Sequence, residues 1–222
     1  RQPVAFIINT EKLISIMNKK IFLIFFLNIF ITQNSYASIQ GAHEFSNSLI
    51  TKIIGIAAEK KNVDEARAGI VQLVEENIDI NYISKFVLGK HWRQTSLEER
   101  HKFATIYEEY LVLTYAPKFQ GYNGETYKIQ STEEISPSKY ITKLSLIMEN
   151  KTSLDLEIFL IELSPKNYKI VDISGEGISL AATQRSEFSS LIATKGVEKF
   201  LTQLEQKISN LKANNLSKRA QN

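Results

Sequence analysis

The sequence contains no cysteine among its 222 residues. This absence excludes a disulfide scaffold, a thiolate zinc site and catalysis by a thiol. The three histidines, His43, His91 and His101, are far apart, and no H-E-x-x-H motif or comparable spacing of metal ligands occurs. We therefore expect no metal and no other cofactor.

Glycine is also sparse, with nine residues in the chain. The stretch Gly175-Glu176-Gly177 lacks the third glycine of a dinucleotide fingerprint and the Lys-Ser/Thr of a P-loop, so it is predicted to be a strand-to-helix turn. No G-x-S-x-G elbow of a serine hydrolase is present. Nearby Asp172 has the ordinary interpretation of a salt bridge, for example with Arg185, or a turn cap.

Neither positive nor negative charge is in excess over most of the chain. Four of the 27 basic residues and one of the 24 acidic residues lie in residues 1–37, which leaves 23 of each sign in residues 38–222. A neutral domain has no electrostatic footprint for phosphate backbones or anionic membranes, so we expect no nucleic-acid partner.

The beginning of the chain has the layout of a secretory signal peptide. Met17 is a plausible start, and two lysines, an apolar run over residues 21–31 and a Ser-Tyr-Ala boundary ending at Ala37 follow it. The alternative is a membrane anchor. However, the run of 11 residues spans roughly 17 Å, which is well short of the roughly 30 Å hydrocarbon core. We expect cleavage after Ala37 and assign no function to residues 1–16.

The cleaved product is expected to be soluble, because no lipid-attachment cysteine stands at the cleavage point. In a Gram-negative cell this means the periplasm. The domain prediction is a leader over residues 1–37 with the signal peptide at 17–37, a single domain over 38–211, and a polar, disordered tail over 212–222.

Apolar residues first recur with the period of a helix. We expect helices around residues 45–56, 63–77, 78–88 and 97–116, and later over 180–194 and 197–211. Ser96 and Glu99 fit a capping box at the start of the fourth helix. Gly89 and Gly196 are placed as C-terminal caps.

Between these helices the period changes from 3.6 to two. Strands are expected over residues 126–133, 140–149, 154–163 and 168–174, and the short connections between them predict an antiparallel sheet. Helices, then strands, then helices predict an α+β domain, with about four strands packed by N-terminal and C-terminal helices.

Three stretches then carry a resemblance to a known family. They are F-V-L-G-K-H-W-R with T-S-L-E-E-R over residues 86–100, D-I-S-G-E-G-I-S-L over 172–180, and R-S-E-F over 185–188 with Gly196 and Leu204 further on. In this order, over about residues 43–208 and behind a signal peptide, they resemble the MlaC family, also called toluene-tolerance proteins.

The resemblance implies a fold and a function. The family fold is a highly curved sheet with helices across it, similar to a nuclear-transport-factor-like (NTF2-like) cone with a helical addition, and it encloses an apolar lipid cavity. The family function is that of a periplasmic carrier of phospholipid that maintains outer-membrane lipid asymmetry. The implied partners are phospholipid as cargo, an MlaA-like outer-membrane lipoprotein complex and an MlaD-like MCE-domain ABC transporter of the inner membrane. We expect a monomer without enzymatic activity.

Candidate pocket residues are apolar or aromatic side chains of the predicted sheet and helices. They are Phe86, Val87, Tyr107, Tyr110, Leu111, Leu144, Leu146, Met148, Leu156, Ile158 and Leu160. Such residues also form ordinary cores. Lys90, Trp92 and Arg93 are candidates for a rim near the lipid headgroup. The alternative for Trp92, the only tryptophan, is packing at a helix corner.

Two other classes of protein stay open. A small enzyme of the isomerase or hydratase type would use Tyr107, Tyr110 and Asp172 as acid and base, although fold-level analogy is a weak argument. A periplasmic adaptor would bind envelope proteins through its apolar helices. A cavity of the size of a lipid tail separates the carrier from the adaptor.

Overall fold

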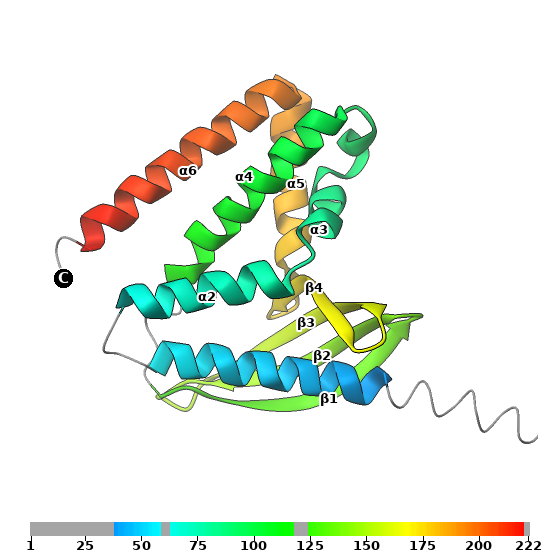
Figure 1. Cartoon of the computed structure of the whole chain (residues 1–222), viewed down its shortest axis with the longest axis vertical. Helices are drawn as coiled ribbons and strands as arrows, with labels where there is room; N and C mark the ends of the chain where they lie inside the picture. The colour runs from blue at the N-terminus through cyan, green and yellow to red at the C-terminus, as the bar shows by residue number, and fades with distance from the viewer. Residues whose placement is uncertain (1–37, 59–62, 118–123, 220–222) are drawn as a thin grey trace, which may run out of the picture.

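The computed structural model describes residues 38–58, 63–117 and 124–219. The predicted leader over residues 1–37, with Met17 and the run at 21–31, lies outside these ranges. Figure 1 shows two parts, a sheet with two helices lying along it and a group of helices that stands away from the sheet. In the described residues no helix combines the length and apolar character needed to cross a membrane.

The sheet is antiparallel, as predicted. Its order is β1-β2-β3-β4-β5, where β1 is Thr126–Ser136, β2 is Lys139–Ile147, β3 is Ser153–Ser164, β4 is Asn167–Gly175 and β5 is Ile178–Ser179. The two-residue strand β5 was not predicted, because two residues carry no period. The fold is α+β, which confirms the prediction.

The helix over residues 38–58 covers one face of the sheet. Ala42, Leu49 and Ile50 are buried against apolar residues of β2, β3 and β4, among them Leu144, Ile158, Leu160 and Ile170. Ile158 and Leu160 are two residues apart and therefore point to the same face of β3. This cluster is the sheet core.

A second core lies among the other helices, α3 (Ile80–Leu88), α4 (Leu97–Tyr115), α5 (Leu180–Lys195) and α6 (Val197–Arg219). Its centre is aromatic: the Phe103 ring stacks on Tyr107 at 5.1 Å between ring centroids and meets Phe188 edge-on at 6.2 Å. Phe200 of α6 closes this cluster. It is called the helical core below.

Helix α2 (Val63–Asn77) and the start of α3 join the two parts. Ile78, between these helices, forms a parallel bridge with Ile170 of β4, and the amide of Asp79 donates to the carbonyl of Ile170 at 3.0 Å. Asp79 then accepts a hydrogen bond from the amide of Tyr82 and caps α3. The sheet and the helices are therefore held together next to β4.

Local sequence signals explain where the helices begin and end. The predicted capping box is confirmed, because Ser96 accepts from the amide of Glu99 and Glu99 accepts from the amide of Ser96. Gly89 and Gly196 have φ of 53° and 80°, the left-handed region that glycine adopts without steric cost. Between α3 and α4 the chain forms the short 3-10 helix η1 (Gly89–Arg93).

The predicted disordered tail needs a correction. Helix α6 continues to Arg219 and so includes residues 212–219 of that tail, while 220–222 lie outside the described residues. Contacts with α4 hold the extension: Lys212 pairs with Glu109 at 2.6 Å, and the Asn215 side chain donates to the carbonyl of Leu113. The polar composition of this segment suggested disorder. Composition does not reveal the stabilising contacts, because they are made with residues distant in the sequence.

Candidate functional site

An apolar cavity of about 220 Å³ lies where β4 meets the helices, and we call it cavity A. Apolar side chains form most of its wall, with a few polar groups of which Asp172 and Gln184 matter most. Its full lining is Val74, Ile78, Ile83, Tyr107, Leu111, Tyr115, Ile170, Asp172, Ile173, Leu180, Ala181 and Gln184. Cavity A therefore lies between the helical core and the sheet.

A second cavity of about 210 Å³, cavity B, lies on the other side of α3. It is lined by Tyr82, Phe86, Ile135, Lys139, Tyr140, Phe159, Leu160, Val171, Asp172 and Ala181. Asp172 and Ala181 line both cavities, so the two spaces adjoin there.

An irregularity in β4 explains why neighbouring residues of that strand line these cavities. Phe159 pairs with Asp172, but Leu160 pairs with Ile170, so Val171 has no partner in the register. Such a β-bulge interrupts the alternation of side chains between the two faces of a sheet. As a result, the consecutive residues Val171 and Asp172 both line cavity B.

The carboxylate of Asp172 has a structural role. It accepts hydrogen bonds from the amides of Ile173 at 2.8 Å and Ala181 at 3.0 Å, and from the hydroxyl of Ser179. Ser179 in turn caps α5 by accepting from the amide of Ala182. Of the two alternatives for Asp172, the turn cap is confirmed, and it fixes the start of α5 against β4.

Polar groups on the helix side of cavity A are largely paired with one another. The hydroxyl of Tyr107 donates to Oε1 of Gln184, and both side chains are buried. Burial, with smaller contributions from Tyr115, Tyr110 and Asp172, raises the pKa of Tyr107. Its hydroxyl therefore stays protonated and acts as a donor at neutral pH.

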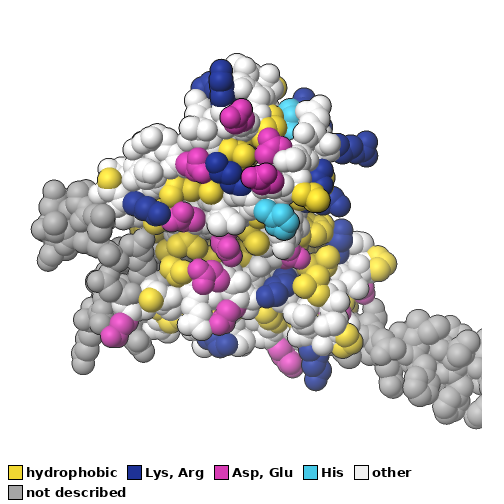
Figure 2. All heavy atoms as spheres, turned by 45° about the horizontal axis from the view of Figure 1, so that its top comes forward, with side chains coloured by type: hydrophobic (Ala, Val, Ile, Leu, Met, Phe, Trp, Pro, Cys, Tyr) yellow, Lys and Arg dark blue, Asp and Glu magenta, His cyan; other side chains and the backbone are white. Residues whose placement is uncertain are grey.

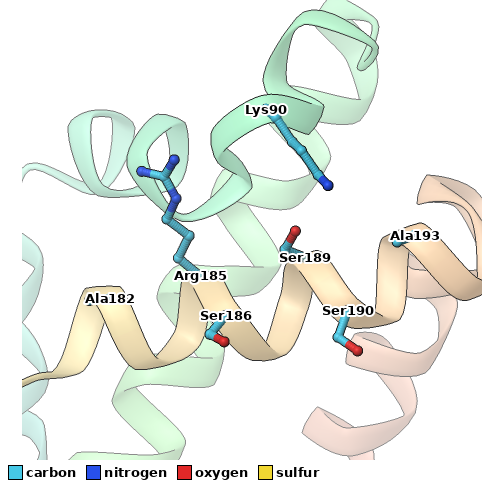
Figure 3. A pocket seen from close by; sticks show the side chains of 7 residues that line it. All are labelled: Lys90, Ala182, Arg185, Ser186, Ser189, Ser190 and Ala193. Carbon is cyan, nitrogen blue, oxygen red and sulfur yellow. The ribbon is translucent and has the colours of Figure 1, made fainter.

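A shallow groove of about 410 Å³ runs along the outer face of α5. It is lined by Lys90, Ala182, Arg185, Ser186, Ser189, Ser190 and Ala193, and we call it the α5 groove. Figure 3 shows Lys90 reaching from η1 toward the helix that carries the three serines. The Ser189 hydroxyl points toward Lys90, whereas the Ser186 and Ser190 hydroxyls point to the opposite side of the helix (Figure 3). The two cations, with no carboxylate in the lining, favour an anionic ligand.

One contact links the α5 groove to cavity B. The guanidinium of Arg185, which lines the groove, lies 4.9 Å from the centre of the Phe86 ring, which lines the cavity. Arg185 also packs so closely on Gly89 that a Cβ there would lie 2.9 Å from its Nε. Gly89 thus leaves room for the arginine between the apolar cavity and the basic groove.

The structure places the predicted pocket residues in three settings. Phe86, Tyr107, Leu111 and Leu160 line a cavity. Val87 and Tyr110 belong to the helical core, and Leu144, Leu156 and Ile158 belong to or pack on the sheet core. Leu146 is half-buried, and Met148 is 36% exposed at the end of β2; neither lines a cavity described above.

The three candidates for the rim of the lipid site lie in different parts of the structure. Lys90 lines the α5 groove, whereas Trp92 and Arg93 do not. Trp92 packs against the helical core beneath Arg100, whose guanidinium lies 4.5 Å from the ring centre. Arg100 also donates to the carbonyl of Trp92, so this tryptophan stabilises the corner between η1 and α4.

Sequence reasoning missed Arg185 as a groove residue and Gln184 as a cavity residue. A signal for Gln184 was present: the buried face of α5 is Ala181, Gln184, Phe188 and Ile192, so a polar side chain stands on an apolar stripe. Arg185 begins the R-S-E-F stretch that carries the family resemblance, but no local pattern placed it in a groove, because that position depends on η1, which is distant in the sequence.

Acidic and basic side chains are interspersed over the face drawn in Figure 2, with hydrophobic side chains between them. This mixture agrees with the neutral charge balance of the sequence after residue 37. The lining of the α5 groove differs from this mixture, because it contains Lys90 and Arg185 and no carboxylate.

Comparison with known proteins identifies the family. The model of the family described as MlaC protein matches residues 44–206. Since this is more than half of the chain, the chain belongs to the MlaC family, as its motifs predicted.

One relative and one solved structure extend the comparison. The intermembrane phospholipid transport system binding protein MlaC of Haemophilus influenzae is 24% identical over 135 residues, which are 60% of this chain and 63% of that protein. The phospholipid-binding protein from Ralstonia solanacearum, solved in complex with a phospholipid, has a TM-score of 0.65 and 18% identity, and the match covers 75% of this chain and 96% of the other. At this identity the likeness establishes the fold.

Proposed function

We propose that this protein is a periplasmic carrier that binds a phospholipid with its tails in cavities A and B. The observation that carries the proposal is cavity A itself, an apolar space between the sheet and the helices of a member of the MlaC family. The structural relative from Ralstonia, described as a complex with a phospholipid, supports the same ligand class.

The two cavities suit a ligand with two apolar branches. Ligand sites usually measure about 300–1,000 Å³, and each cavity, at about 220 and 210 Å³, is smaller than this range. Because they adjoin at Asp172 and Ala181, one ligand reaches a combined volume within the range by placing one tail in each. Full-length acyl tails need more volume than the two cavities provide. Helix α3, which lies between the cavities, must therefore move as the ligand enters.

The α5 groove provides a place for the phosphate of the headgroup. Arg185 stands between the groove and Phe86 at cavity B, so a lipid with a tail in that cavity brings its phosphate near this arginine. Lys90 lines the same groove and adds a second cation, and the Ser189 hydroxyl points toward it from α5 (Figure 3). This extends the rim prediction for Lys90 to residues of α5.

The geometry favours binding over catalysis. An enzyme would use Tyr107, Tyr110 and Asp172, but the Asp172 carboxylate is engaged in capping α5. The raised pKa of Tyr107, caused mainly by burial, keeps its proton in place. Tyr110 packs in the helical core against Tyr107 and Phe188. None of the three is arranged for proton transfer to a ligand.

The proposed route runs between the outer membrane and an inner-membrane transporter. The relative from Haemophilus is named as the binding protein of an intermembrane phospholipid transport system, which supports this role. The partners are then an MlaA-like lipoprotein complex and an MlaD-like MCE-domain ABC transporter, and the protein acts as a monomer after removal of its leader. Its task is to maintain outer-membrane lipid asymmetry.

The energetics explain why such a carrier needs a docking partner. Two tails of about sixteen carbons represent a gross transfer free energy of roughly 25 kcal/mol at about 0.8 kcal/mol per methylene. This exceeds the ceiling of about 18–21 kcal/mol for non-covalent binding, so the net value is smaller but still large. Escape of lipid into water is then very slow, and delivery requires an acceptor that offers a continuous apolar path.

The experiment is purification through aqueous chromatography, followed by solvent extraction and mass spectrometry. We expect a diacyl phospholipid in the extract, absent from a periplasmic protein of similar size prepared in parallel. Transfer to an MCE-domain acceptor should then become faster as the acceptor concentration rises. Failure to take up phospholipid, either during expression or from vesicles, would refute the carrier role.

A further inference from the structure

A buried hydrogen-bond donor faces cavity A without a partner. Gln184 is 5% exposed and lies on the cavity wall. Its Oε1 accepts from the hydroxyl of Tyr107, but its Nε2 makes no hydrogen bond within the part of the chain that the structure describes. Burial raises the pKa of Tyr115, and an interaction with the Gln184 side chain opposes that rise, so the amide lies near this hydroxyl as well. Nε2 is nevertheless a buried atom without a hydrogen bond.

Such a donor is costly unless a ligand satisfies it. A buried polar group without a partner destabilises a protein by roughly 1–3 kcal/mol, and the large majority of buried polar groups are therefore paired. An apolar residue at this position would complete the buried stripe of Ala181, Phe188 and Ile192. The amide therefore indicates a ligand with a hydrogen-bond acceptor.

The neighbouring polar groups narrow the chemistry of that acceptor. The carboxylate of Asp172 already accepts from Ser179 and Ala181, and the hydroxyl of Tyr107 already donates to Gln184. The Tyr115 hydroxyl, also on this wall, interacts with the Gln184 side chain and is not without a partner. Nε2 of Gln184 is the donor on this mainly apolar wall that is left without a hydrogen bond. A ligand that fits must combine apolar chains with a neutral acceptor such as an ester carbonyl.

The position of Gln184 matches the place of this carbonyl in a phospholipid. It lies three residues beyond Ala181, on the same face of α5, and Ala181 lines both cavities. If each cavity holds one tail, the tails diverge at Ala181 and the glycerol esters lie close by. We propose, on the basis of the function proposed above, that Gln184 Nε2 donates a hydrogen bond to an acyl-ester carbonyl and selects ester over ether phospholipids.

The test compares two lipids in one sample. The lipid-free protein is incubated with vesicles of equal parts diester and diether phosphatidylcholine of the same chain length and then separated from the vesicles. Bound lipid is quantified by mass spectrometry. Wild type should hold the diester in roughly three- to tenfold excess, because the ether oxygen is a weak acceptor and leaves Nε2 unpaired.

Three variants test whether the ratio of bound diester to bound diether lipid depends on the side-chain amide of Gln184. Gln184→Met removes the donor at similar size and should bring the ratio to about one. Gln184→Met also leaves the Tyr107 hydroxyl without its acceptor, which could impair folding. In that case the double variant Tyr107→Phe with Gln184→Met replaces it in the test and should give the same ratio of about one. Gln203→Met makes the same change at an exposed position of α6 and should retain the wild-type ratio.

The outcomes separate this inference from the proposed function. Binding of both lipids in equal amounts by wild type would overturn the role of Gln184 and leave the carrier function intact. A preference that persists in the folded Gln184→Met protein would overturn it as well. Failure of either lipid to bind would refute the carrier function together with this inference.

Discussion

Asp172 of β4 accepts a hydrogen bond from the backbone amide of Ala181 at 3.0 Å, and these two residues line both cavities. The contact thus sets the start of α5 against the sheet at the point where the two cavities adjoin. The bulge at Val171 positions the carboxylate for this bond. The same groups that hold the sheet to α5 therefore shape the proposed ligand site.

Replacing Asp172 by alanine should lower the free energy of unfolding by about 1–3 kcal/mol, because the amide of Ala181 and the hydroxyl of Ser179 lose their acceptor. Chemical denaturation measures this change. Asp155→Ala is the control: Asp155 is exposed and accepts from Ser145, so its loss should cost less than about 0.5 kcal/mol. Equal costs for the two variants would contradict the capping role of Asp172.

Added bulk should distinguish cavity from core. Leu111→Trp extends into cavity A and should reduce bound lipid per folded molecule with little change in melting temperature. Ile158→Trp adds the same bulk to the sheet core and should cost roughly 1–3 kcal/mol of stability through overpacking. Lipid content and melting curves from the same preparations check both. A large loss of stability in Leu111→Trp with unchanged lipid content would show that this position is core.

Neutralising Arg185 should weaken binding of lipids that carry a phosphate. Arg185→Gln should lower affinity for phosphatidylglycerol roughly tenfold, as loss of a charge-assisted hydrogen bond does. It should leave diacylglycerol of the same tails unaffected, because that lipid has no phosphate. Arg93→Gln is the matched control, since Arg93 does not line the α5 groove. An identical loss for both lipids would indicate a structural role, and binding of inorganic phosphate without lipid would indicate a free-anion site.

Acid should remove a stabilising contribution of Glu162. Burial acts to raise the pKa of this carboxyl, but hydrogen bonds from the Lys166 amide at 3.1 Å and the Tyr140 hydroxyl at 3.0 Å outweigh it, so the pKa is lowered. A lowered folded-state pKa stabilises the fold above the unfolded value of about 4.3, and the contribution is lost as pH falls through the folded value.

The difference in melting temperature between wild type and Glu162→Gln should therefore be largest near neutral pH and small at pH 3 or below. Glu44→Gln, on the helix over residues 38–58, reports the effect of removing one exposed charge alone. A difference for Glu162→Gln that is constant between pH 3 and 7 would disprove the contribution.

Much of the secondary structure followed from periodicity. The amphipathic period and the turn residues located α2, α4 and the four long strands, and the Ser96–Glu99 pair marked the start of α4. These signals are local, since they depend on backbone geometry and on side chains within a few residues of each other. Local signals failed at α6, where contacts with α4 sustain eight residues of helix beyond the predicted end at Leu211.

The cavities depend on contacts that no local pattern encodes. Leu144 and Leu160 have the same apolar character and the same alternating pattern, yet Leu144 lies in the sheet core and Leu160 also lines cavity B. The difference arises because α3 and the bulge at Val171 lie beside Leu160 and not beside Leu144. Packing between segments distant in the sequence thus decides which apolar residues line a cavity.

The sequence by itself determined the α+β class, the family and the neutral charge balance after residue 37, because composition, period and motif are properties of the chain. The tertiary structure decided which groups form a site. Asp172 faces two cavities and caps α5 because β4 bulges at Val171. Gln184 of α5 pairs through Oε1 with Tyr107 of another helix, and its buried Nε2 is left without a hydrogen bond. Such assignments require the relative positions of separate elements, which are fixed only when the sheet and the helices pack together.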